Sequence, residues 1–146
     1  MIKMEQSVVI NRPVEEVFEF LANPENGPQW QSGIQEVRKT SEGPVGVGTT
    51  FINVGQLLGR RIESTVEYSE YEPNRRVAAK SISGPLPYKF EVTFEPAAED
   101  GTKVTTRGEA EVGGFFKLAE PIAARMLKRQ FETDNANLKD LLESQS

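Results

Sequence analysis

Hydrophobic and polar residues alternate with a period of two along much of the chain. The alternation is clearest over 88–95 and 102–112, which predict a β-hairpin joined near Asp100 and Gly101. In the first of these strands the apolar side consists of Tyr88, Phe90, Val92 and Phe94, and the polar side of Lys89, Glu91, Thr93 and Glu95. The predicted sheet therefore has one apolar and one polar face, as antiparallel sheets commonly do.

Shorter segments complete the expected elements of the first half. Further strands are predicted over 3–10, 34–40, 49–54, 60–71 and 76–83. Between the first two of them, Val14, Val17, Phe18 and Leu21 recur at helical spacing and predict a short amphipathic helix over 13–22. The segment 26–32 is expected to be a broken stretch with one helical turn.

After Gly113 and Gly114 the period changes to 3.6, which predicts a helix from about 116 to 142. Pro121 should mark its true start or a kink. The apolar half of this helix consists of Phe116, Ala119, Ala123, Met126, Leu127, Phe131, Leu138 and Leu141. The pattern predicts an α+β domain spanning 1–146, in which a curved antiparallel sheet is covered on its apolar face by the C-terminal helix.

Two polar residues, Gln130 and Asp134, project into the apolar half of the C-terminal helix. A carboxylate in such surroundings needs a partner or a raised pKa. Both side chains could bond to neighbouring strand groups and fix how the helix docks. Alternatively, they contact a ligand or transfer protons.

The apolar face of the predicted sheet mixes large and small side chains. The small ones are Ser64, Ala79, Ser81, Thr106, Gly108 and Ala110, and they lie between Tyr68, Tyr88, Phe90 and Phe94. Small residues beneath a long helix can leave a cavity whose hydroxyls orient a ligand. They can equally make room for Met126 and Phe131 to pack tightly, and the pattern alone does not separate the two.

Composition removes several classes of function. The 17 basic and 22 acidic residues give a net charge of −5, which argues against nucleic-acid binding. The basic residues Arg125, Lys128 and Arg129 are expected to form a solvated helix face. The chain contains no cysteine and no histidine, so thiol nucleophiles, histidine bases and imidazole-ligated zinc are excluded, and we predict no transition-metal site.

No segment has the pattern of a signal peptide, and no stretch reaches the roughly 18 apolar residues of a membrane span. A cytoplasmic protein is expected. The glycine-rich connection 43–48 lacks the lysine of a phosphate-binding loop and the strand-to-helix context that such a loop requires.

Several motifs together resemble one protein family. They are the strand followed by Asn11-Arg12-Pro13-Val14-Glu15-Glu16-Val17-Phe18, Trp30 after the broken stretch, Gly46-Val47-Gly48-Thr49 at a strand entry, and Tyr71-Glu72-Pro73-Asn74-Arg75. In this order and spacing they resemble the START-like proteins of the SRPBCC superfamily, in the branch labelled polyketide cyclase/dehydrase and lipid transport. The resemblance covers essentially the whole chain.

The resemblance implies a helix-grip fold, with one strand, two short helices, six strands and a long helix. It also implies a deep cavity between sheet and helix for lipids, aromatic polyketides or other hydrophobic molecules. The family includes enzymes, carriers and sensors and has no universal catalytic motif, so the resemblance assigns pocket-lining roles only.

Pattern and resemblance together give one set of candidate ligand-binding residues and no catalytic residue. The set consists of Trp30, Phe51, Ser64, Tyr68, Ser81, Tyr88, Phe90, Thr106, Met126, Gln130 and Asp134. Trp30 and the loop 43–48 are expected near the entrance of the cavity.

We expect a binding protein for a small hydrophobic ligand, without cofactor or metal, that is a monomer or homodimer. The main alternative is a polyketide cyclase/dehydratase-type enzyme, in which Asp134, Tyr68 or Tyr88 would be the acid–base group. A third possibility is a structural domain with a filled interior.

Overall fold

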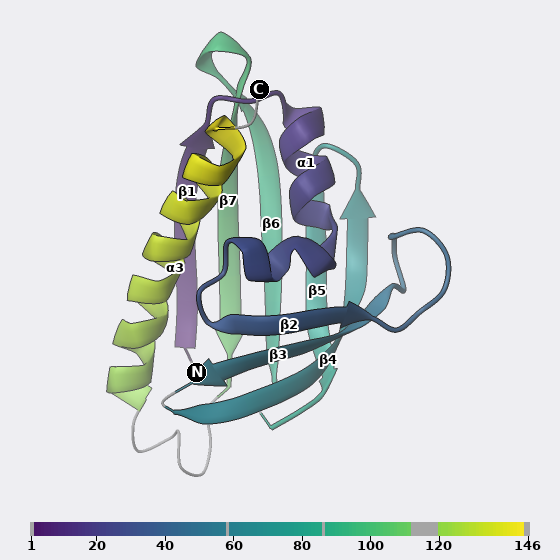
Figure 1. Ribbon diagram of the computed structural model, residues 1–146, viewed down its shortest axis with the longest axis vertical. Coiled ribbons are helices and arrows are strands. Elements are labelled where there is room, and N and C mark those ends of the chain that lie inside the picture. The colour runs from purple at the N-terminus through teal and green to yellow at the C-terminus, as the bar shows by residue number, and fades with distance from the viewer. Residues whose placement is uncertain (1, 58, 86, 112–119, 145–146) are drawn as a thin grey trace.

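The computed structural model describes residues 2–57, 59–85, 87–111 and 120–144 (Figure 1). Its elements are β1 (Ile2–Ile10), α1 (Val14–Ala22), the 3-10 helix η1 (Pro24–Gln29), β2 (Ile34–Lys39), β3 (Thr50–Leu57), β4 (Arg60–Glu72), β5 (Arg76–Ser83), β6 (Tyr88–Ala97), the 3-10 turn η2 (Ala98–Asp100), β7 (Gly101–Ala110) and α3 (Glu120–Glu143). The part of the predicted C-terminal helix before Glu120, including Phe116 and Ala119, lies outside the described residues. Pro121 lies in the first described turn of α3.

The seven strands form one antiparallel sheet in the order β1-β7-β6-β5-β4-β3-β2. The first strand of the chain therefore pairs with the last, with Ile2 opposite Ala110 and Ile10 opposite Thr102. Figure 1 shows α3 running alongside β1, across the concave side of the sheet. This arrangement confirms the predicted helix-grip fold.

The sheet bends along β4, whose first half pairs with β3 and whose second half pairs with β5. Figure 1 shows β2 and β3 crossing at a steep angle to β5, β6, β7 and β1. The β4–β5 pairing shifts register twice at this bend, between Thr65 and Val66 and between Tyr68 and Glu70. Such bulges increase local twist and bend a strand. The bend creates the concave surface that α3 faces.

The solid part of the core lies at the end of the sheet near α1. Phe18 of α1 packs edge-on against Phe94 and Tyr71, with ring centroids 5.1 and 5.4 Å apart. Leu138 and Leu142 of α3 are also almost completely buried there. Because this end is filled by large side chains, it anchors α1 and the last turns of α3.

The outer face of the sheet is the predicted polar face, and it carries cross-strand ion pairs. Arg107 on β7 lies 3.1 Å from Glu5 on β1 and 3.5 Å from Glu91 on β6. Lys89 pairs with Glu109 at 3.5 Å. These partly exposed pairs each contribute little to stability, and they account for the strand carboxylates without a catalytic role. None of the helices in the described part of the chain is long and apolar enough to cross a lipid bilayer.

Candidate functional site

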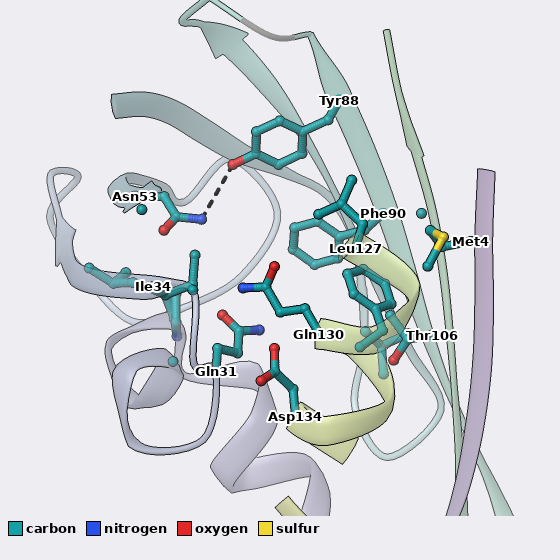
Figure 2. A pocket seen from close by; sticks show the side chains of 18 of the residues that line it. Met4, Gln31, Ile34, Asn53, Tyr88, Phe90, Thr106, Leu127, Gln130 and Asp134 are labelled. Carbon is teal, nitrogen blue, oxygen red and sulfur yellow. Dashed lines mark hydrogen bonds between the residues drawn. The ribbon is translucent and has the colours of Figure 1, made fainter. Parts of the chain in front are cut away.

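A cavity of about 310 Å³ lies between the concave face of the sheet and the middle of α3, from Leu127 to Leu138. This volume is at the lower end of the range for small-molecule pockets. Figure 2 shows side chains from the sheet, from α3 and from the segment after η1 projecting into it. Most of its wall is apolar, formed by residues that include Met4, Leu21, Ile34, Val37, Phe51, Ile62, Phe90, Leu127 and Phe131.

Small residues of β7 form the floor beneath α3. Thr106, Gly108 and Ala110 all line the cavity. The ring of Phe131 lies over Gly108, since a Cβ built there would be 3.7 Å from the Phe131 Cζ atom. The small residues thus accommodate Phe131 and also leave space beside it.

A polar cluster from three strands faces the cavity at one end. Asn53 of β3 donates from Nδ2 to the Tyr88 hydroxyl of β6 at 3.4 Å, as the dashed line in Figure 2 shows. The Asn53 Oδ1 and Ser64 Oγ atoms are buried, and neither has a hydrogen-bond partner among the described residues. Burial raises the pKa of Tyr88, and its neighbours Asn53 and Ser64 offset this in part. The Tyr88 phenol is therefore neutral at physiological pH and can donate a hydrogen bond.

A second polar cluster lies where α3 meets the segment between η1 and β2. Asp134 is 6% exposed, and its Oδ1 atom accepts hydrogen bonds from the backbone N–H and the hydroxyl of Ser32, both at 2.8 Å. Burial raises the pKa of Asp134, and the two bonds from Ser32 partly offset this. Figure 2 shows the side chains of Gln31, Gln130 and Asp134 gathered together there. Asp134 therefore fixes α3 to the loop that contains Ser32, whereas the sequence suggested that its partner would be a strand. Asp134 also lines the cavity.

The cavity adjoins an outer groove at Gln130. Gly33, Gln56 and Gln130 line both the cavity and this groove, whose outer wall includes Met126 and Arg129. We call the opening bounded by Gly33, Gln56 and Gln130 the mouth. The Gln130 side chain lies at this mouth, between α3 and the segment before β2.

Comparison with known proteins places the chain in a family. Residues 1–143 match the family described as polyketide cyclase / dehydrase and lipid transport. The chain belongs to this family. Members of the polyketide cyclase/dehydrase and lipid transport family bind or process hydrophobic ligands, and the resemblance seen in the sequence is confirmed.

Individual relatives of the family are distant in sequence. An uncharacterized 17.2 kDa protein from Streptomyces lincolnensis is 25% identical over 145 residues, covering 98% of this chain and 91% of the relative. Among solved structures, a START superfamily protein from Mycobacterium smegmatis is 14% identical with a TM-score of 0.78, and each chain is covered completely. The Zhui aromatase/cyclase from Streptomyces sp. R1128 is 16% identical with a TM-score of 0.79, covering 97% of this chain and 93% of that one. These likenesses show the same fold.

Within this family fold, most of the predicted site residues come together. The predicted residues that line the cavity are Trp30, Phe51, Ser64, Tyr68, Tyr88, Phe90, Thr106, Gln130 and Asp134. Ser81 and Met126 do not line it. The Ser81 hydroxyl accepts a hydrogen bond from the Tyr88 backbone N–H at 2.9 Å, so it supports the strand end that carries Tyr88.

Met126 is 45% exposed and borders the outer groove instead of the cavity. Met126 lies on the edge of the apolar half of α3, one turn before Gln130. At this point the edge of the helix faces the outer groove. Its predicted place inside the helix–sheet interface is therefore wrong.

The glycine-rich loop 43–48 contributes no residue to the cavity wall. It connects β2 to β3, and Gly48 donates a backbone hydrogen bond to Tyr68 at 2.9 Å. Val45 packs against the core. The loop is thus not part of the cavity wall, and its place near the entrance stays a prediction.

Asn53 and Gln31 are among the cavity residues that escaped the sequence analysis. Asn53 follows Phe51 by two positions on the same strand, so the alternation that selected Phe51 also indicates Asn53. Gln31 lies in an irregular turn, where no periodicity shows the direction of a side chain. In the described residues, no group of three or more Asp or Glu side chains is arranged to hold a metal ion.

Proposed function

We propose that this protein binds one small hydrophobic molecule in the cavity between its sheet and α3. The observation that carries the proposal is a largely apolar cavity wall into which buried polar atoms project without partners. Apolar walls with a few convergent polar groups are typical of small-molecule sites. Burying about 300 Å² of ligand surface is worth about 7 kcal/mol before the costs of association.

Native mass spectrometry of the protein expressed in its own host tests the proposal. We expect a noncovalent adduct of one small molecule per chain, which is lost on denaturation. Thr106→Phe should fill the cavity and abolish the adduct. Glu95→Phe adds the same side chain to an exposed position outside the cavity and should retain it. An adduct that survives Thr106→Phe unchanged would contradict the proposal.

One observation favours a second function, an acid–base enzyme of the cyclase or dehydratase type. Asp134 faces the cavity, its pKa is raised by burial, and no described residue forms a hydrogen bond with its Oδ2 atom. A carboxyl in this state can exchange a proton with a bound substrate. Figure 2 shows that the Oδ atoms lie beside Gln31 and Gln130, which could orient such a substrate.

Asp134→Asn separates the two functions. The amide keeps an oxygen that can accept both bonds from Ser32, but it cannot exchange a proton. The molecule recovered by mass spectrometry is used to measure affinity and turnover in the same folded variant. Loss of turnover with affinity retained identifies an enzyme, whereas unchanged turnover removes Asp134 as its acid–base group.

A further inference from the structure

The cluster of Asn53, Ser64 and Tyr88 is an unusual feature of an otherwise apolar wall. Ser64 is 3% exposed, lines the cavity and has a hydroxyl with no hydrogen-bond partner among the described residues. Asn53 Oδ1 is buried and equally without a partner. Leaving buried polar atoms unpaired costs free energy. Unpaired atoms at the wall of a cavity indicate that the occupant supplies the missing hydrogen bonds.

The hydrogen-bonding capacities of the cluster define the group that would satisfy it. Tyr88 already accepts a hydrogen bond from Asn53, so its own proton is free to donate. Ser64 adds a second hydroxyl, whereas Asn53 Oδ1 can only accept. A hydroxyl group on the ligand, which both accepts and donates, is complementary to all three side chains. A carbonyl or ether oxygen could satisfy only the donors.

Charge selects against an anionic ligand. The charged residues at the cavity are Lys89, Glu109 and Asp134. Lys89 and Glu109 pair with each other on the outer face of the sheet, and the Lys89 side chain is 69% exposed. Among the described residues, the cavity thus presents no cation to a carboxylate, whose burial without a partner is costly.

On the basis of the proposed binding function, we propose that the ligand is an uncharged molecule with an apolar body and a hydroxyl group, and that Asn53, Ser64 and Tyr88 bind this hydroxyl. Figure 2 shows Asn53 and Tyr88 across the cavity from Asp134. The cluster therefore lies opposite the docking carboxylate, with the apolar wall between them to hold the body of the ligand. Phenols and alcohols fit this description, whereas free fatty acids do not.

A series of four naphthalenes tests the proposal by calorimetry at pH 7 on the full chain. Naphthalene offers only an apolar body, 2-methoxynaphthalene adds an acceptor, 2-naphthol adds a donor and an acceptor, and 2-naphthoate adds a negative charge. We expect 2-naphthol to bind about tenfold more tightly than naphthalene, the scale of one or two net hydrogen bonds. 2-Methoxynaphthalene should lie between them, and 2-naphthoate should bind at least about tenfold more weakly than 2-naphthol.

Variants then locate the effect. Tyr88→Phe and Ser64→Ala should each reduce the advantage of 2-naphthol over naphthalene to about twofold or less, with naphthalene itself little affected. Thr65→Val is the matched control, because it removes a hydroxyl from the position next to Ser64 on β4, and Thr65 does not line the cavity. It should leave the advantage intact.

The outcomes separate this inference from the proposed function. If naphthalene binds but 2-naphthol gains nothing over it, the cavity binds hydrophobic molecules and the hydroxyl site is refuted. An equal loss in Thr65→Val, or 2-naphthoate binding as tightly as 2-naphthol, also overturns the inference. If none of the four probes binds, both the proposed function and the inference about the ligand hydroxyl fail.

Discussion

The side-chain amide of Gln130 lies directly against the backbone of Gly33. A Cβ atom built at Gly33 would be 1.6 Å from Gln130 Nε2 and 2.7 Å from Gln130 Cδ. The Gly33 carbonyl in turn lies close to β3, because a Cβ atom built at Gly55 would be 2.6 Å from the Gly33 carbonyl oxygen. That oxygen also accepts a hydrogen bond from the Gln56 N–H at 3.1 Å. Glycine at position 33 thus allows Gln130 to lie across the mouth.

Gly33→Ala should displace the Gln130 side chain and widen the mouth. Because the amide is the end of a flexible side chain, we expect a stability loss of about 1 kcal/mol or less. Entry and exit of an uncharged probe, N-phenyl-1-naphthylamine, should both become several-fold faster while its Kd changes little. Stopped-flow fluorescence measures both rates.

Gln130→Ala is the matched variant for the mouth, since it removes the same side chain without a steric clash. It should accelerate the two rates as Gly33→Ala does, and the double variant should add nothing further. Rates that stay at the wild-type value in Gln130→Ala would show that ligands enter elsewhere.

Trp30 provides an intrinsic probe of the cavity. It is half-buried, lines the cavity, and its carbonyl accepts a hydrogen bond from Asn137 of α3 at 3.3 Å. A bound ligand should shift or quench the fluorescence of Trp30 saturably, since Trp30 is the only tryptophan. Trp30→Ala should weaken binding by about 1–3 kcal/mol, the value of one large apolar contact. Trp30→Phe should retain most of the affinity.

The contrary result for Trp30 is equally informative. If calorimetry shows binding while the emission stays constant and Trp30→Ala binds normally, the indole is a structural plug beneath η1.

The pKa of Asp134 predicts how stability depends on pH. Because burial raises the pKa in the folded state above its unfolded value, the ionised carboxyl destabilises the folded protein. This destabilisation is absent below the unfolded pKa and develops as pH rises through the folded pKa. Asp134→Asn should therefore be more stable than the wild type at pH 7, by at most about 1 kcal/mol, the scale of a typical hydrogen bond.

The gain from Asp134→Asn should shrink as the pH is lowered towards 4, which urea unfolding at several pH values measures. Ser32→Ala is the control, because it removes only the side-chain bond to Asp134 and leaves the backbone bond. A stability loss in Asp134→Asn that grows as the pH rises from 4 to 7 would contradict the assignment, because the ionised carboxyl would then be the favoured form in the folded protein.

The fold could be predicted from the sequence because each strand carries its own alternation. Val92 and Phe94 fall in the predicted apolar phase and are buried, and β5 has the predicted bounds, Arg76–Ser83. Strand pairing then follows from short connections between antiparallel neighbours. The pairing of β1 with β7, which closes the sheet beside α3, joins the two ends of the chain and leaves no local pattern, so it was not predicted.

The site could be predicted only in part, because side chains at the edge of a face are not fixed by periodicity. Met126 and Gln130 lie one turn apart on the same edge of α3, yet Met126 is exposed and Gln130 lines the cavity. What separates them is the segment containing Gly33, which approaches α3 at Gln130. Such a long-range contact leaves no local pattern.

Ser64 provides a test of the unpaired cavity cluster that needs no ligand. Its buried hydroxyl has no partner among the described residues, so Ser64→Ala should be neutral or stabilising, by up to about 1 kcal/mol. Thr102 is the matched control, because its equally buried hydroxyl donates to the Arg12 carbonyl at 2.9 Å. Thr102→Val keeps the shape of the side chain but leaves the Arg12 carbonyl without this hydrogen bond. It should lower the free energy of unfolding by about 1–3 kcal/mol. Urea unfolding of the ligand-free protein measures both. A loss in Ser64→Ala as large as that in Thr102→Val would mean that the Ser64 hydroxyl is satisfied in the empty protein, and the argument for a ligand hydroxyl at this position would lose its basis.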